Sequence, residues 1–214
     1  MKFSELQLLL SAGESSTVEY KRKINNPEKL AKEICAFANT KGGVIIIGID
    51  DDGTIKGIKS EKTELDIVEK ACGFYIVPEI QAEMQLFDVQ GKDLLVVIIK
   101  EGTHKPYKAM SHIEDDKVVY QVFIRIGESS IPASSEMSRL LKSQASDKPL
   151  RLSIGDKEKR LFQYLEKYNR ATVKDFAGLV NISKRRAEQL LIRLVRAGVL
   201  QINSDTHHDY FTLV

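Results

Sequence analysis

The sequence predicts an α+β protein in which a mixed β-sheet with flanking helices occupies the first two thirds of the chain. Two continuous apolar runs, Val44–Ile47 and Leu94–Ile99, are typical of strands that are covered on both faces. Segments with helical spacing alternate with such strands up to about residue 145, whereas the residues after Pro149 show mainly helical patterns. These observations favour a larger sheet-containing part and a smaller helical part.

The first part is predicted to begin with a helix and a strand. Phe3–Leu10 has the pattern of a short helix that ends at Gly13, and Val18–Lys23 alternates in the manner of a strand with one polar face. Glu19 and Lys21 must then point the same way, as in many exposed ion pairs. Asn26-Pro27 is typical of a helix start, with asparagine as N-cap and proline in the first turn. Later helices are expected at 63–74 and 134–145, and strands at 80–89, 92–100 and 118–126.

The segment from Ala36 to Ile58 combines a helix end, a buried strand and a tight turn. Gly42-Gly43 stops the helix, because glycine readily takes the positive φ needed at a helix C-terminus. Asp51-Asp52-Gly53 then turns the chain, and Thr54–Ile58 is expected to return as a hairpin partner. Asp50 lies where the strand meets the turn, a position suited either to a turn former or to a site residue.

The last part has the element order of a winged helix-turn-helix. Helices are expected at 156–168, 173–179 and 184–197, with Thr172 and Ser183 as N-caps, and strands at 199–203 and 210–213 complete the pattern. Ser143–Pro149 is polar and ends in proline, which is typical of a linker. We therefore predict a first domain over residues 1–146 and a winged helix over residues 150–214.

The small net charge of +2 conceals an asymmetry between these parts. Residues 150–214 carry 12 Lys/Arg and 7 Asp/Glu, a net charge of +5, whereas residues 1–149 carry 20 and 23, a net charge of −3. A basic C-terminal part favours a polyanionic partner for that part alone, although a solvated basic face without a ligand is the alternative.

The third helix of this part is the candidate recognition helix. Lys184, Arg185 and Arg186 stand in its first turn, and Gln189 and Arg193 extend the same side. Arginine and glutamine can read base edges in the major groove, and lysine and arginine neutralise phosphates. We predict that these residues bind nucleic acid, DNA rather than RNA. Winged helices also serve as protein-docking or dimerisation modules, which is the competing interpretation.

Two further motifs give little support for nucleotide or metal binding. Gly42-Gly43 lacks the GxxxxGK[ST] pattern and follows a helix, so ATP binding there is poorly supported. His207-His208 lies in the expected wing loop, and no other nearby ligand favours a metal site.

The composition indicates a cytoplasmic protein. The chain has no run of about 18 apolar residues, so no membrane span is expected, and its first residues make a poor signal peptide. Cys35 and Cys72 are separated and fall on helical patterns, which fits buried thiols in a reducing compartment.

Four motifs together resemble the Schlafen-type AlbA-like domain, the AlbA-2 family. They are ESSTVEYK (14–21), ICAFANTKGGVIIIGIDDDGTIKGI (34–58), HKPY (104–107) and FIRIGESS (123–130). The resemblance covers roughly two thirds of the chain, and bacterial members are similar in carrying a C-terminal winged helix. It implies DNA-binding regulation in bacteria, whereas animal relatives use the domain to cleave RNA with three carboxylates.

Carried onto this sequence, the resemblance implies a carboxylate site of Glu14, Glu19 and Asp50, with Lys21 at the lysine of the motif. Asp51 or Asp52 takes the place of Asp50 if the turn is aligned differently. Such carboxylates would hold Mg²⁺ or Mn²⁺, and Lys21 would stabilise charge on a phosphate.

A structural interpretation competes with this site. Glu14 and Glu19 would then be partners of Lys21, of Arg125 or of a backbone turn. Animal nucleases also pair two such domains in one chain, whereas this chain has one, so a homodimer would have to supply the second. The sequence thus yields two leading hypotheses, a dimeric DNA-binding transcriptional regulator and a metal-dependent nuclease. A third, a nucleotide-binding sensor, is weaker because no phosphate motif supports it.

Overall fold

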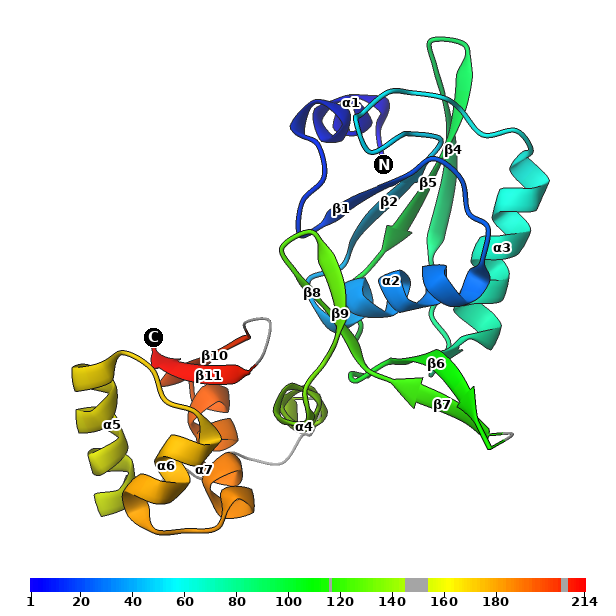
Figure 1. Ribbon diagram of the computed structural model, residues 1–214. Helices are drawn as coiled ribbons and strands as arrows, with labels where there is room; N and C mark the ends of the chain where they lie inside the picture. Colours follow the sequence, from blue (N-terminus) through cyan, green and yellow to red (C-terminus); the bar gives the residue numbers. More distant parts are fainter. Residues whose placement is uncertain (116, 145–153, 205–207) are drawn as a thin grey trace. The chain divides into compact units, whose positions relative to one another are not determined.

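The computed structural model describes residues 1–115, 117–144, 154–204 and 208–214, which fall into two compact units, Met1–Pro132 and Ala133–Val214 (Figure 1). Helices and strands alternate in the first unit and helices predominate in the second, which confirms the predicted α+β class. The predicted domain limits, 1–146 and 150–214, stay a prediction. Most of the expected linker, 145–149, lies outside the described residues.

The first unit contains three helices and nine strands within its described residues. The helices are α1 (Phe3–Ala12), α2 (Pro27–Asn39) and α3 (Glu61–Phe74). The strands are β1 (Val18–Lys21), β2 (Gly43–Ile47), β3 (Ile76–Val77), β4 (Glu83–Val89), β5 (Lys92–Ile99), β6 (Lys108–Glu114), β7 (Lys117–Gln121), β8 (Phe123–Ile126) and β9 (Ser129–Pro132).

The main sheet is mixed and has the strand order β1-β2-β5-β4. β1 pairs with β2 in parallel, and the β2–β5 and β5–β4 pairs are antiparallel. The remaining strands form a three-stranded sheet, β3-β6-β7, and a two-stranded β8-β9 ribbon beside α2 (Figure 1). The first unit is thus built around one sheet with smaller strand groups next to α2.

Both faces of the main sheet are covered, as the continuous apolar runs predicted. Ile45 and Ile47 of β2 pack with α2 and α3 in one core cluster, whereas Ile46 packs with Leu6 of α1 on the opposite face. All four of these side chains are fully buried. Successive residues of a strand point to opposite faces, so a strand buried on both sides shows no alternation.

The start and end of α2 follow from its sequence. Asn26 Oδ1 accepts the backbone N–H groups of Glu28 and Lys29, at 2.7 and 3.3 Å, as expected of the predicted N-cap. Gly42 has φ +73°, and Gly43 passes so close to α2 that a Cβ would lie 2.3 Å from the ring of Phe37. The glycine pair therefore permits a close approach between α2 and β2.

Two predicted strands need correction, and three observed strands were not predicted. Thr54–Ile58 forms no strand, although an isolated bridge, Ile49↔Ile55, and backbone hydrogen bonds from Lys56 and Gly57 to the carbonyl oxygen of Gly48 join it to the chain before the turn. The reason is that β1 and β5 already occupy both edges of β2. The strand expected at 118–126 is divided at Val122 into β7 and β8, which pair with β6 and β9 respectively. The unpredicted strands are β3, which has only two residues, and β6 and β9, which are exposed over much of their length.

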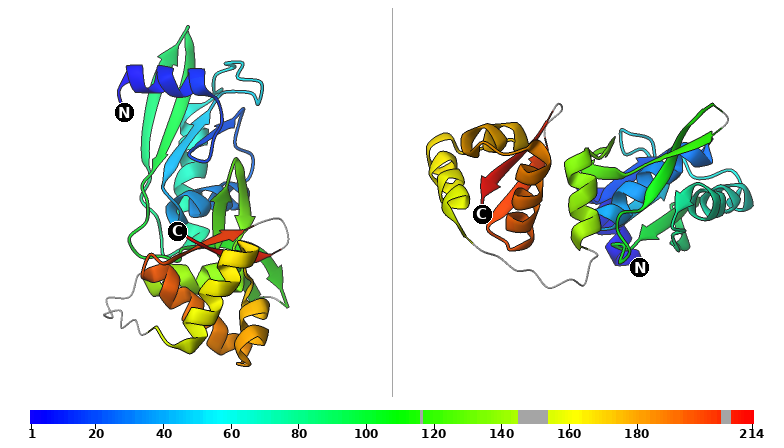
Figure 2. Two further views of the ribbon diagram at one scale, coloured as in Figure 1. Left: turned by 90° about the vertical axis from the view of Figure 1, so that its left-hand side faces the viewer. Right: turned by 90° about the horizontal axis from the view of Figure 1, so that it is seen from below.

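The second unit contains four helices and one hairpin within its described residues. They are α4 (Ser135–Gln144), α5 (Asp156–Tyr168), α6 (Val173–Val180), α7 (Lys184–Arg196), β10 (Leu200–Ser204) and β11 (Asp209–Leu213). Thr172 and Ser183 cap α6 and α7 through their side chains, as predicted. Phe176, Leu191 and Phe211 meet in its core, so the antiparallel β10–β11 hairpin packs beside α7 (Figure 2).

No helix among the residues that the structure describes combines the length and apolarity needed to cross a bilayer. Cys35 and Cys72 are both buried free thiols, as the sequence indicated. Burial raises the pKa of Cys35 to about 12 and that of Cys72 to about 11, so neither thiol is activated.

Candidate functional site

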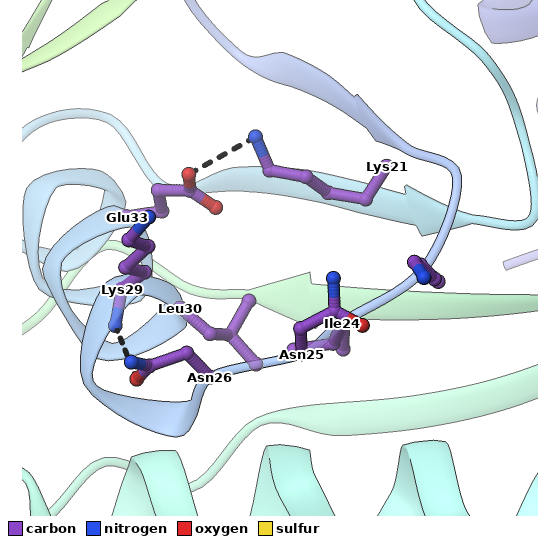
Figure 3. Close-up of a pocket in the computed structure, with 8 residues that line it drawn as sticks. Lys21, Ile24, Asn25, Asn26, Lys29, Leu30 and Glu33 are labelled. Atoms are coloured by element: carbon purple, nitrogen blue, oxygen red, sulfur yellow. Dashed lines mark hydrogen bonds and ion pairs between the residues drawn. The ribbon is translucent and has the colours of Figure 1, made fainter.

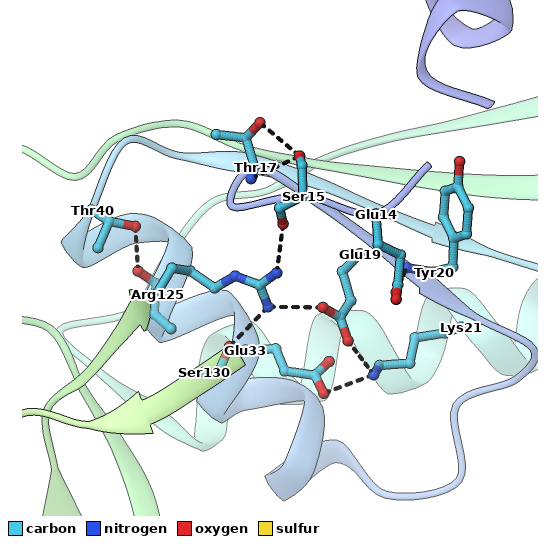
Figure 4. Close-up of polar contacts among 11 residues, drawn as sticks. Glu14, Ser15, Thr17, Glu19, Tyr20, Lys21, Glu33, Thr40, Arg125 and Ser130 are labelled. Atoms are coloured by element: carbon cyan, nitrogen blue, oxygen red, sulfur yellow. Dashed lines mark hydrogen bonds and ion pairs between the residues drawn. The ribbon is translucent and has the colours of Figure 1, made fainter. Parts of the chain in front are cut away.

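Four charged side chains from three elements meet beside the edge strand β1 (Figure 4). This charged cluster consists of Glu19 and Lys21 of β1, Glu33 of α2 and Arg125 of β8. Lys21 Nζ lies 2.5 Å from Glu19 Oε1 and 3.0 Å from Glu33 Oε1, and Arg125 Nη1 lies 2.8 Å from Glu19 Oε2. Glu19 and Lys21 do point the same way, as the strand alternation required.

Arg125 is the most enclosed member of the charged cluster. Its side chain is only 2% exposed. Besides the pair with Glu19, it donates to the carbonyl oxygen of Ser15 at 2.9 Å and to Ser130 Oγ at 3.2 Å. The guanidinium also lies 4.5 Å from the ring centroid of Phe37. Its position is therefore fixed from several sides.

Glu33 has an unsatisfied oxygen. Oε1 faces Lys21, whereas Oε2 is buried and has no hydrogen-bond partner. Burial raises the pKa of Glu33 above its ordinary value of 4.5, although the charge and hydrogen bond of Lys21 oppose the shift. For Lys21 burial alone would lower the pKa, but the combined hydrogen bonds and charges of Glu19 and Glu33 outweigh it and raise the pKa.

Two hollows adjoin the charged cluster and share Lys29 and Glu33. One, of about 260 Å³, lies along the chain from Lys21 to Asn26 (Figure 3). The other, of about 250 Å³, is bordered by α2 and by β8 with the turn that follows it. Lysines contribute to both, so the surroundings of Glu33 are cationic as well as acidic. The lysines that line one or both are Lys21, Lys23, Lys29 and Lys32.

Glu14 and Asp50 lie outside the charged cluster. Glu14 Oε1 accepts the backbone N–H of Tyr20 at 2.7 Å, so it holds the turn before β1. Asp50 faces two cations, with Arg22 Nε at 3.5 Å and Lys56 Nζ at 3.7 Å.

The alternative aspartates, Asp51 and Asp52, are exposed turn residues. Asp52 Oδ1 accepts the backbone N–H of Thr54 at 2.8 Å, and the hydrogen bonds of Thr54 lower the pKa of Asp52. These contacts hold the turn.

A divalent ion needs several oxygen ligands at about 2.0–2.6 Å, and the residues do not provide them. Within the described residues, no three histidine, cysteine, aspartate or glutamate side chains form a group that could hold a metal ion. Glu14, Glu19 and Asp50 thus do not fit Mg²⁺ or Mn²⁺ in this arrangement. Their catalytic and metal-binding roles, like that of Lys21, remain predictions. The contacts of Glu14 and Glu19 are those of the structural interpretation, with a backbone amide, Lys21 and Arg125 as partners.

Glu33 was not predicted from the sequence, although a signal was present. It follows Leu30 by three positions and precedes Phe37 by four, so it lies on the inward stripe of α2. A carboxylate on an otherwise apolar stripe needs a partner inside the protein, and Lys21 is that partner.

The second unit presents the predicted recognition helix with its basic side outward. The five predicted nucleic-acid-binding residues are all exposed, and within the described part of the chain no ion pair engages them. They are Lys184, Arg185, Arg186, Gln189 and Arg193. Leu191 and Leu194 on the other side of α7 are buried. Helical spacing accounts for this separation of a polar face from a core face.

One acidic residue of α7 is an exception. The Glu188 side chain is 5% exposed and pairs with Arg139 of α4 through Oε2. Its negative charge is therefore turned away from the exposed basic face and is balanced inside the unit.

Comparison with known proteins identifies the family of the first unit. Residues 14–134, more than half of the chain, match the family described as Schlafen, AlbA_2. The chain therefore belongs to the Schlafen AlbA_2 family, as the four motifs indicated. Residues 157–213 match a different description, the PCI domain, so the second unit is similar to that domain.

Two solved structures are similar over part of the chain. The DIP2311 protein from Corynebacterium diphtheriae is 20% identical, with a TM-score of 0.45, over 69% of this chain and 34% of that one. The chain thus spans about a third of that protein's length. The N-terminal domain of a RecG-related protein from Nitrosomonas europaea is 30% identical, with a TM-score of 0.41, over 59% of this chain and 86% of that domain.

Removal of Arg125 should destabilise the first unit strongly. In Arg125→Ala the largely enclosed Glu19 loses its 2.8 Å contact with the guanidinium, and we expect a loss of about 3 kcal/mol in the free energy of unfolding. Urea denaturation followed by circular dichroism measures it. The control is Arg22→Ala, whose side chain is 66% exposed and for which we expect a loss below about 1 kcal/mol. Equal losses in the two variants would contradict the assigned role of Arg125.

Glu33→Gln should alter the pH dependence of stability. Because folding raises the pKa of Glu33 above 4.5, this group favours the folded state most below that pH, and the benefit is lost as the pH rises through the raised pKa. We expect Glu33→Gln to be more stable than wild type near neutral pH and to lose that advantage below pH 4.5. Urea midpoints between pH 4 and 8 test this, with the exposed Glu69→Gln as control. A pH-independent difference would contradict it.

Proposed function

We propose that this chain is a nucleic-acid-binding protein, and specifically a DNA-binding transcriptional regulator that contacts duplex DNA through α7. The observation that carries the proposal is the outward basic face of this helix, on which Arg185, Gln189 and Arg193 lie without an ion pair to any described residue. Membership of the Schlafen AlbA_2 family supports an association with nucleic acids.

The geometry of α7 suits insertion into a major groove. The helix begins at Lys184 with a Ser183 cap, so its positive dipole end and its first cations coincide. Arg185, Gln189 and Arg193 follow one another at four-residue spacing and therefore share a face. Side chains of these types both read bases and bind phosphates.

The order of the elements around α7 supports the proposal of a winged helix-turn-helix. α6 and α7 are joined by a short turn, and the β10–β11 hairpin follows α7 in the place of a wing. His208 immediately precedes β11, and His207 is outside the described residues. In this proposal the hairpin contacts the DNA backbone beside the groove.

The first unit would pair two copies of the chain. Symmetric dimers bind two half-sites about one helical turn apart, so a homodimer would place two α7 helices on one face of the DNA. A regulator of this kind would act in the cytoplasm, and no membrane partner is proposed.

Neutralising two cations of α7 should weaken DNA binding. We expect Arg185→Ala with Arg186→Ala to lower affinity for duplex DNA, and to lower the slope of log K against log salt by about 1.8 if each contacts one phosphate. Fluorescence anisotropy at several salt concentrations measures both. The control, Lys159→Ala with Arg160→Ala on α5, removes the same charge and should leave the slope unchanged. Identical behaviour of the two double variants would argue against α7 as the contact.

The competing hypothesis is a metal-dependent nuclease that acts through Glu14, Glu19 and Asp50. The contacts of these residues do not favour it, and we expect no cleavage of labelled RNA or single-stranded DNA with Mg²⁺ or Mn²⁺. Gel analysis of the products tests this, with Asp50→Asn as the matched variant because Asp50 is partly exposed. Cleavage by wild type that Asp50→Asn abolishes would establish the nuclease.

A further inference from the structure

A second polar hollow lies entirely within the Ala133–Val214 unit. It has a volume of about 620 Å³ and is bounded by the amino ends of α4, α6 and α7 and by the start of β11. Its charged lining includes Arg139, Lys174, Lys184, Arg185 and Glu188. This hollow belongs to neither the charged cluster nor the outward face of α7, although it shares Lys184 and Arg185 with the proposed DNA contact.

Part of the charge around the hollow is already balanced. Asp209 accepts hydrogen bonds from the hydroxyl groups of Ser134 and Ser204, which satisfy its oxygens but leave its negative charge in place. Arg139 is paired with Glu188. Lys174, Lys184 and Arg185 remain exposed, and no described residue forms an ion pair with any of them. Glu136 also lines the hollow, so its four Lys/Arg and three Asp/Glu side chains leave a net charge of +1, and the three cations without an ion pair are available to a ligand.

Glu188 places a further requirement on a ligand of the hollow, because this side chain is acidic. Its side chain is only 5% exposed, and its Oε1 atom has no hydrogen-bond partner. A buried acceptor without a partner is costly, and such groups are rare in folded proteins. A ligand that fills the hollow can relieve this cost only if it brings a hydrogen-bond donor.

We propose that the hollow binds a phosphate monoester. A monoester that retains its second proton carries one negative charge for the cations and can donate that proton to Glu188 Oε1. Because the second pKa is near 6, a fraction of the monoester keeps this form near neutral pH. Sulfate and phosphate diesters carry no proton at neutral pH, so Glu188 repels them. The volume exceeds that of a phosphate group and leaves room for the esterified molecule.

Two sources supply this chemistry, a small phosphorylated metabolite and the 5′-phosphate end of a nucleic acid. In both cases the ligand binds Lys184 and Arg185, so it competes with duplex DNA for these side chains. This competition rests on the proposed DNA-binding function, whereas binding of the phosphate group does not.

The first experiment compares inorganic phosphate with sulfate at equal ionic strength, using the full chain and isothermal titration calorimetry at pH 6.5. We expect phosphate to bind at least about tenfold more tightly, the discrimination typical of one hydrogen bond to a buried charged group. In Glu188→Gln, whose amide can donate to sulfate, the ratio should fall to about 1–3. Lys174→Gln should weaken both anions alike, and Arg160→Gln on α5 should change neither.

Circular dichroism establishes that each variant is folded, and Lys174→Gln tests the site even if Glu188→Gln unfolds. Equal binding of phosphate and sulfate by wild type, or no binding of either, would overturn the proposal. The source is then identified with AMP and with matched 5′-phosphorylated and 5′-hydroxyl oligonucleotides. A phosphate site without any effect on duplex affinity would leave the site intact and argue against the proposed DNA contact.

Discussion

The first unit depends on one buried guanidinium. Arg125 draws its partners from three separate stretches of the chain, Ser15 and Glu19 before and in β1, Phe37 in α2, and Ser130 in β9. An enclosed cation needs hydrogen bonds and a counter-charge, so each of these groups is required at its place. The motifs ESSTVEYK, AFANTKGG and FIRIGESS therefore belong together because they converge on the same side chain.

This convergence gives the acidic residues of the first motif a structural task. Glu19 compensates Arg125 and orients Lys21, while Glu14 accepts a backbone amide near the start of β1. Carboxylates engaged in this way have fewer lone pairs for another ligand. Glu33 differs, because one of its oxygens is buried without a partner and it borders both hollows of the first unit. The carboxylate oxygen of this cluster that lacks a partner thus lies on α2 rather than on β1.

Local sequence signals predicted much of this architecture, and pairing between distant segments explains what they missed. The caps Asn26, Thr172 and Ser183 fix helix starts through contacts within a few residues, which a sequence shows directly. Thr54–Ile58 has strand-like residues, but whether β2 has a free edge depends on β5, some forty residues further along. In the site, the pair between Glu19 and Arg125 was one of several open interpretations, since its members are 106 positions apart.

Glu188 shows why α4 matters to the proposed nucleic-acid contact. A carboxylate near the middle of a DNA-reading helix would repel phosphates if it faced outward. In this structure it faces inward and is paired with Arg139, so α4 supplies the counter-charge that leaves the outer face of α7 purely cationic among its described ionic residues. The basic character of the second unit is therefore a matter of placement as well as of composition. A change in α4 would alter the electrostatics of α7 without touching any residue of its outward face.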